Sequence, residues 1–247
     1  MTSQLIAARA VFIGVFTVVL AGATPAVAAT CCADCNNDGQ VTINELIRGV
    51  NLALTGDCTP SPDAGGGLLQ TGQTTCYDSA GSETPCAGTG QDGEGQEGAS
   101  FSYTDNGDGT VTDNVTGLMW EKLADDGSVH DKDNRYTWAE AFDVKIATLN
   151  ADRFAGHTDW RLPNLRELQS LVDVGRAGPS TALAFDTTCT VGCTPRSCSC
   201  TISSVYWSST TYENSPANSW AVYFNVGIVN TIKKSDAYYV RAVRGGS

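Results

Sequence analysis

Ten cysteines, all between residues 31 and 200 of the 247-residue chain, constrain the fold more than any other feature. They form three local groups, and an even number of cysteines in an exported chain indicates disulfide bonds. The alternative for the last group is a zinc site, but its C-x3-C-x4-C-x-C spacing matches no common zinc pattern. The disulfide candidates are Cys31, Cys32, Cys35, Cys58, Cys76, Cys86, Cys189, Cys193, Cys198 and Cys200.

Residues 1–28 are typical of a secretory signal peptide. Arg9 supplies positive charge, residues 10–20 are apolar, and Ala26-Val27-Ala28 is an A-x-A cleavage site. The alternative is an uncleaved anchor, for which this apolar run is short, and no second run of about 18 apolar residues follows it. We therefore expect an exported chain, secreted or at the cell surface, with no membrane span.

The charge balance excludes one class of partner. The chain has 15 Lys and Arg residues against 27 Asp and Glu residues, a formal net charge of -12. Nucleic acids and anionic membranes attract positively charged proteins. No nucleic-acid partner is expected.

Residues 34–45, DCNNDGQVTINE, fit the calcium loop of EF-hand proteins. Gly39 stands where the sharp turn requires a residue without a Cβ, and apolar residues at helical spacing follow the loop. The alternative is an acidic turn before a helix. The expected calcium ligands are Asp34, Asn36, Asp38, Gln40 through its backbone carbonyl, Thr42 and Glu45.

The loop and helix at residues 29–58 resemble a dockerin type I repeat. Dockerins usually carry two repeats, and no second loop follows here. The resemblance implies a cohesin-like partner. The cysteines around this unit are expected to staple its ends, since so small a segment cannot build its own core, and calcium is expected to be structural.

Residues 59–100 are predicted to be an acidic linker rich in Gly and Pro. Within it, Cys76 and Cys86 are expected to close a small hairpin-like loop. Residues 87–99 are expected to be a solvated loop.

From residue 101 the pattern becomes that of a folded domain, residues 101–247. Apolar and polar residues alternate on both sides of residues 106–109, Asn-Gly-Asp-Gly, which predicts a hairpin of two or three short strands. A second calcium site at this acidic turn is the alternative, but Gly107 and Gly109 offer no side-chain ligands.

Two helices and further strands follow the hairpin. Thr137 with Glu140, and Asn164 with Glu167, form capping boxes that predict two helix starts. Alternating segments near residues 204–213, 219–231 and 238–245 predict strands. We expect an α+β domain in which both helices pack on a sheet and the terminal strands meet.

Five segments of this domain resemble the C-terminal domain family of the Legionella collagen-like adhesin (Lcl). They are TDNGDGTVTDNVTGLMWEK, TWAEAF, DWRLPNLRELQSL, YWSSTTY and YYVRAVRGG. The resemblance implies a C-type lectin-like fold used for binding rather than catalysis. The adhesin binds sulfated glycans, but an acidic chain should repel sulfates, so we expect a glycan or surface-protein ligand of another kind. The cysteine-rich insert at residues 189–200 departs from the family pattern.

Aromatic and amide side chains gather between the last two of these segments, where they suit an adaptable recognition surface. Alternation predicts that Trp220 is in the core, whereas Tyr223 and Asn225 are exposed. The alternative is that half of the set are ordinary strand residues. The predicted ligand-binding residues are Tyr212, Glu213, Asn214, Asn218, Tyr223, Asn225 and Asn230.

Four residues of the DWRLPNLRELQSL segment are predicted to be structural. Trp160 is expected to be buried, and Arg161 is expected to enter a hydrogen-bond network. Pro163 and Glu167 complete the set.

Catalysis is not expected. His130 and His157 lie in polar stretches, where loop histidines are usually solvated, and no nucleophile motif such as G-x-S-x-G accompanies them. Cys198 and Cys200 invite comparison with a lectin-like oxidase that generates formylglycine, but the motifs of that family are missing. The sequence therefore predicts a non-enzymatic binding protein. The alternative is a scaffold protein that docks at the cell surface through its dockerin-like unit.

Overall fold

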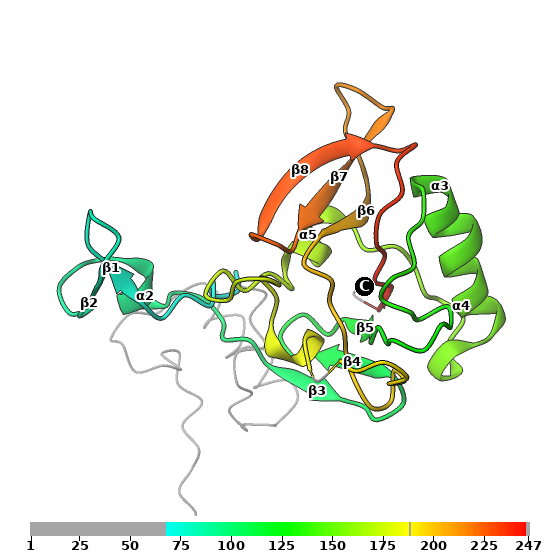
Figure 1. Ribbon diagram of the computed structural model, residues 1–247, viewed down its shortest axis with the longest axis horizontal. Helices are drawn as coiled ribbons and strands as arrows, with labels where there is room; N and C mark the ends of the chain where they lie inside the picture. Colours follow the sequence, from blue (N-terminus) through cyan, green and yellow to red (C-terminus); the bar gives the residue numbers. More distant parts are fainter. Residues whose placement is uncertain (1–67, 188, 246–247) are drawn as a thin grey trace, which may run out of the picture. The chain divides into compact units, whose positions relative to one another are not determined.

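The computed structural model describes residues 68–187 and 189–245. All of them belong to the second of the two compact units into which the chain divides, residues 60–247. Within this described part, short helices combine with three small antiparallel sheets, which confirms the α+β class (Figure 1). Among these residues, no helix has the length and apolar composition that crossing a bilayer requires.

The segment at residues 68–100 contains regular structure. Strands β1 (Cys76–Tyr77) and β2 (Glu83–Thr84) pair antiparallel, and the predicted Cys76–Cys86 disulfide closes them. One helical turn, α2 (Asp92–Gly95), then lies within the stretch that was expected to be a loop.

The predicted hairpin begins a four-stranded sheet in the order β3-β4-β5-β9. Gly107 and Gly109 both have positive φ in its first turn, and the Asp105 carboxylate accepts the Gly107 N–H. Trp120 of β5 pairs with Val243 of β9, so the two ends of the domain meet as expected. The strands are β3 (Tyr103–Asp105), β4 (Thr110–Asp113), β5 (Met119–Glu121) and β9 (Val243–Arg244).

The first predicted helix is continuous but not uniform. It comprises α3 (Trp138–Glu140), a π-helical stretch (Ala141–Ile146) and α4 (Ala147–Ala151). The capping box of Thr137 and Glu140 is present, which confirms the predicted start. A short 3-10 turn (Phe154–Gly156) follows the helix.

The second predicted helix, α5 (Leu165–Gln169), begins at the expected capping box of Asn164 and Glu167. Leu168 and Leu171 are completely buried, and each such leucine contributes roughly 1.5–3 kcal/mol of burial free energy. A 3-10 turn (Leu183–Phe185) buries Phe185 in the same cluster.

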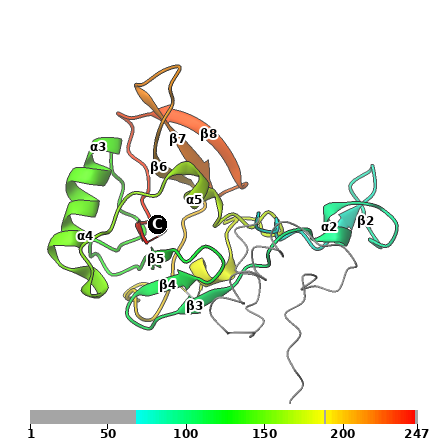
Figure 2. The same ribbon diagram turned by 180° about the vertical axis from the view of Figure 1, so that it is seen from behind.

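The third sheet has hydrophobic residues packed on both faces. Tyr206, Val222 and Phe224 pack in one cluster with the leucines of α5, and Figure 2 shows α5 against this sheet. Trp207 and Ala221 pack in a second cluster with the α3–α4 helix. Val222 and Ala221 pack in different clusters, as alternation along β7 predicts, and both faces of the strand carry buried residues. The strands are β6 (Val205–Thr211), β7 (Asn218–Tyr223) and β8 (Ile228–Lys233).

Candidate ligand-binding surface

An aromatic pair forms at the turn between β6 and β7. The rings of Tyr212 and Trp220 meet edge to face, with their centroids 5.2 Å apart. Both side chains are half-buried, so Trp220 is not the core residue that alternation predicted. The ring packs beside Tyr212 and is not part of the leucine cluster that contains Val222 and Phe224.

The turn backbone and its amides hold this pair in place. The Tyr212 N–H donates to the Asn218 carbonyl at 3.0 Å, and the Asn218 N–H donates to Ser215 at 2.8 Å. The Asn214 side-chain amide lies 3.3 Å from the Tyr212 hydroxyl. Glu213 and Asn214 are exposed, so the turn presents aromatic edges, amides and one carboxylate to solvent.

A second aromatic group lies beside the same turn. The Lys234 ammonium sits 3.9 Å from the centre of the Trp138 ring and donates to the Thr211 hydroxyl at 2.8 Å. Trp138 in turn donates from Nε1 to the Ser208 carbonyl at 3.0 Å. Neither Trp138 nor Lys234 was singled out by the sequence analysis, because their contact joins distant segments of the chain. We call residues 211–220 together with Trp138 and Lys234 the turn surface.

The other predicted ligand residues lie away from this turn. Tyr223 ends β7, about 16 Å along the strand from Asn218, and Asn225 lies in the turn that follows. Asn225 is exposed as expected, whereas Tyr223 is half-buried against the second hydrophobic cluster. Asn230 is exposed on β8 and pairs with Ala221. The structure thus brings together Tyr212, Glu213, Asn214 and Asn218, but not the remaining three.

The predicted structural residues form a compact network. Trp160 is buried and donates from Nε1 to the Phe154 carbonyl at 3.0 Å. The Arg161 guanidinium binds the Glu167 carboxylate through two hydrogen bonds of 2.7 and 2.6 Å. Pro163 is buried, and its carbonyl accepts the N–H of Ser209 in β6. These contacts confirm a buried Trp and a networked Arg.

A cluster of buried charges was missed by the sequence analysis. Glu121 and Lys145 are both buried, and Lys145 Nζ donates to Glu121 Oε1 at 2.5 Å. His130 Nδ1 lies 2.7 Å from the same carboxylate oxygen, so this histidine is not the solvated loop residue that was expected. The Ala242 N–H donates to Glu121 Oε2 at 3.0 Å. The carboxylate is therefore fully partnered.

The electrostatics of this cluster keep Glu121 ionised. Burial alone would raise the pKa of the carboxyl, but the adjacent Lys145 and His130 hold the pKa at about 2. Arg241 is also buried, and it donates to the Glu121 and Cys200 carbonyls at 2.8 and 2.6 Å. No signal in the sequence identifies these residues as buried, because charged residues are usually exposed.

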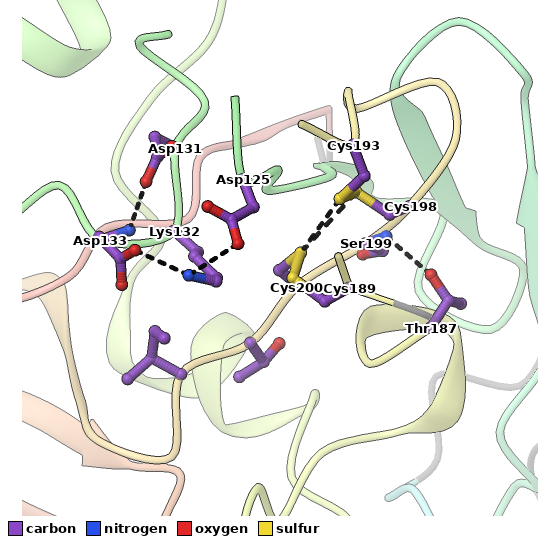
Figure 3. Close-up of a disulfide and its surroundings, with 12 residues drawn as sticks. Asp125, Asp131, Lys132, Asp133, Thr187, Cys189, Cys193, Cys198, Ser199 and Cys200 are labelled. Carbon is purple, nitrogen blue, oxygen red and sulfur yellow. Dashed lines mark hydrogen bonds and ion pairs between the residues drawn. A yellow bond between two sulfur atoms is a disulfide. The ribbon is translucent and has the colours of Figure 1, made fainter. Parts of the chain in front are cut away.

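The last cysteine group forms two disulfides, Cys189–Cys200 and Cys193–Cys198 (Figure 3). The carboxylates of Asp125, Asp131 and Asp133 lie within 4.8 Å of one another, and the Asp125 N–H donates to the Cys193 carbonyl at 3.0 Å. Lys132 lies among them, 3.2 Å from Asp125 and 2.7 Å from Asp133. Its ammonium already supplies positive charge to this acidic cluster.

The remaining predicted residues lie outside the described part of the chain. These are the signal peptide, the calcium ligands Asp34, Asn36, Asp38, Gln40, Thr42 and Glu45, and the cysteines Cys31, Cys32, Cys35 and Cys58. They stay predictions.

Comparison with known families gives one match. The model of the Lcl C-terminal domain matches residues 109–244, from the β3–β4 turn to β9. No curated protein matches the chain.

Proposed function

We propose that this chain, which belongs to the Lcl C-terminal domain family, is an exported adhesin-like protein that binds a glycan at its turn surface. Family membership suggests an adhesin-like binding domain. The predicted signal peptide supports export, and the mixture of short helices with antiparallel sheets is compatible with a C-type lectin-like fold.

The observation that carries this proposal is the half-exposed edge-to-face pair of Tyr212 and Trp220 beside the amides of Asn214 and Asn218. Aromatic rings contact the apolar faces of sugars, while amides both donate to and accept from hydroxyl groups. The hydrogen bonds within the turn preorganise these groups, which lowers the entropy cost of binding.

The charge of the protein favours a glycan without sulfate groups. The net charge of -12 disfavours polyanions, and Glu213 adds a carboxylate to the turn itself. Two lysines lie near the turn: the Lys234 ammonium is engaged by the Trp138 ring and the Thr211 hydroxyl, whereas Lys233, which pairs with Asn218, is exposed. A neutral glycan fits this surface best, and a surface protein is the other ligand class to test.

The contacts of His130 fit a binding protein better than an enzyme. His130 contacts the Glu121 carboxylate, and Lys145 contacts the same group. The Lys145 contact joins β5 to the helix, and the His130 contact joins β5 to the loop that holds this histidine. Both contacts support a structural role for His130 rather than a role as a general base.

The N-terminal unit is proposed to bind one calcium ion through residues 34–45 and to be stabilised by it. A dockerin-like docking function remains the second candidate, carried by the fit of those residues to the calcium loop. It differs from the first in requiring residues 29–58 for surface attachment.

A glycan array tests the main proposal. The mature chain with calcium present is expected to bind neutral oligosaccharides and not sulfated ones. Tyr212→Ala should then raise the Kd at least about tenfold, because truncating an aromatic anchor costs about 2 kcal/mol or more. Tyr77→Ala, at an exposed tyrosine of β1, is the matched control and should leave the Kd unchanged. Equal affinities for the two variants would contradict the site, and binding of proteins alone would contradict the ligand class.

A further inference from the structure

The third sheet ends in a long outer strand. Strand β8 (Ile228–Lys233) follows β7 in the order β6-β7-β8 and lies at the outer side of the sheet (Figure 1). The opposite edge is covered, because Tyr239 accepts the Trp207 N–H at 2.9 Å and donates to the Val205 carbonyl at 3.2 Å. Within the described residues, β8 pairs only with β7.

Alternate residues of β8 direct their backbone groups away from β7. The Lys234 N–H, next in the same register, donates to the Ala217 carbonyl at 2.9 Å, so the even-numbered residues bond to the β7 side. The Thr231 N–H donates instead to the side-chain oxygen of the adjacent Asn230, at 2.8 Å. Three residues therefore direct their N–H and C=O groups outward: Val229, Thr231 and Lys233.

This edge lacks most of the features that protect other sheet edges. Exposed edge strands are usually short, or they carry proline, bulges or charges. Strand β3, the outer strand of the four-stranded sheet, has three residues and ends at Asp105. Strand β8 has six residues, no proline, an unbroken register with β7 and a charge only at its last residue, Lys233. Its first residue, Ile228, is 50% exposed. Such an edge favours pairing with another strand.

The strand is complementary to itself in one antiparallel register. A two-fold axis that sets Thr231 opposite Thr231 of a second copy pairs Val229 with Lys233 on both sides of the axis. Every outward-directed residue of β8 then meets another one. Threonine pairs across strands are favourable, and no two like charges are directly opposite. An axis at Asn230 would instead set Lys233 opposite Gly227, which lies outside the strand.

We propose that two copies of the chain associate through antiparallel pairing of their β8 strands, with Thr231 at the two-fold axis. Each copy contributes three strands to one continuous sheet. The formal net charge of -12 on each copy opposes association, so the dimer should strengthen as the salt concentration rises.

The dimer would carry two turn surfaces, since Lys233 of β8 pairs with Asn218 in each copy. Two linked sites bind a surface that displays many ligands more tightly than one site does. This consequence rests on the proposed function, whereas the dimer itself does not.

Sedimentation velocity of the mature chain over a series of concentrations tests the proposal without any glycan. We expect a monomer–dimer equilibrium. Because the Thr231 N–H does not bond to β7, Thr231→Pro is compatible with an edge strand. The variant removes both N–H donors of the central pair and should raise the Kd of the dimer at least about tenfold.

Engineered cysteines test the register directly. Thr231→Cys should form a disulfide-linked dimer on oxidation, because residues of a hydrogen-bonded pair have their Cα atoms about 5.5 Å apart, within the range of disulfides. Thr104→Cys, at an exposed residue of β3, is the matched control and should stay monomeric. Non-reducing electrophoresis compares the two variants.

Three results would overturn the proposal. A parent chain that stays monomeric at every concentration and salt would leave the edge to a strand from another protein. A dimer with the same Kd in a folded Thr231→Pro variant would place the interface elsewhere. If Thr231→Pro loses its near-ultraviolet circular dichroism, the cysteine variants decide, and equal cross-linking of Thr231→Cys and Thr104→Cys would exclude this interface.

Discussion

Lys145 and Glu121 form an ion pair whose two side chains are both excluded from solvent, with 2.5 Å between Nζ and Oε1. Lys145 comes from the π-helical stretch and Glu121 from β5, so the pair joins the helix to the four-stranded sheet. Lys145 Nζ also donates to the Val129 carbonyl at 2.6 Å. The pair therefore fixes three segments at one point in the core.

Breaking this pair should destabilise the domain strongly. Lys145→Met leaves the Glu121 carboxylate buried without its main cation, and such a loss costs about 3–5 kcal/mol. Urea denaturation measures the change in unfolding free energy. The Glu121→Gln/Lys145→Met double variant removes both charges and should lose less than the sum of the single variants. Strictly additive losses would show that the two residues do not interact.

The same pair predicts a dependence of stability on acid. The pKa of Glu121 is about 2 in the folded chain against 4.5 as its ordinary value, because Lys145 and His130 outweigh burial. A depressed folded pKa stabilises the fold above the unfolded pKa, and this stabilisation disappears as the pH falls from 4.5 towards 2. The contribution is about 3 kcal/mol. Urea denaturation at pH 5 and at pH 2.5 gives the unfolding free energy at each pH. The unfolding free energy should therefore fall less between pH 5 and pH 2.5 for Glu121→Gln than for the parent. An equal fall in the two proteins would contradict the contribution of ionised Glu121 to stability.

The second capping box predicts a smaller effect. The Asn164 side chain accepts the Glu167 N–H at 3.0 Å, and Asn164→Ala removes this acceptor. The loss should cost about 1 kcal/mol and lower the Tm by about 2–4 °C. Asn164→Ser keeps a hydroxyl acceptor and is expected to melt close to the parent. Thermal melts followed by circular dichroism compare the two variants, and equal losses would mean that the cap does not stabilise α5.

Calcium binding tests the N-terminal unit. Calorimetric titration of chelator-treated mature chain should show one ion bound through residues 34–45. Glu45→Gln weakens the carboxylate that closes the loop and should abolish or greatly weaken the heat of binding. Glu83→Gln, at an exposed residue of β2, is the control and should bind like the parent. If Glu45→Gln binds equally well, residues 34–45 are only an acidic turn.

Local signals in the sequence predicted the local structure well. Both capping boxes begin helices, residues 106–109 form the first turn, and the Cys76–Cys86 pair forms a disulfide. The meeting of the terminal strands was also predicted. Each of these features depends on residues close in sequence or on a general packing rule.

Contacts between distant segments account for what was missed. Glu121, Lys145 and Arg241 are buried only because they satisfy one another or backbone carbonyls across three elements. The stack of Lys234 on Trp138 likewise joins segments far apart in the chain. The seven predicted ligand residues divide into separate groups because β7 carries Tyr223 away from the turn that holds Tyr212. Periodicity assigns a residue to a face of a strand but not to one end of a sheet.

Hydrogen exchange with a bound neutral glycan would locate the binding surface most directly. The turn surface predicts that the backbone amides of residues 211–220 exchange more slowly when the glycan is present, including the Tyr212 and Asn218 amides that close the turn. Amides at residues 223–228, around the turn between β7 and β8, should exchange at the same rate with and without it. Protection confined to residues 223–228, or to another part of the domain, would show that Tyr212 and Trp220 do not form the ligand site.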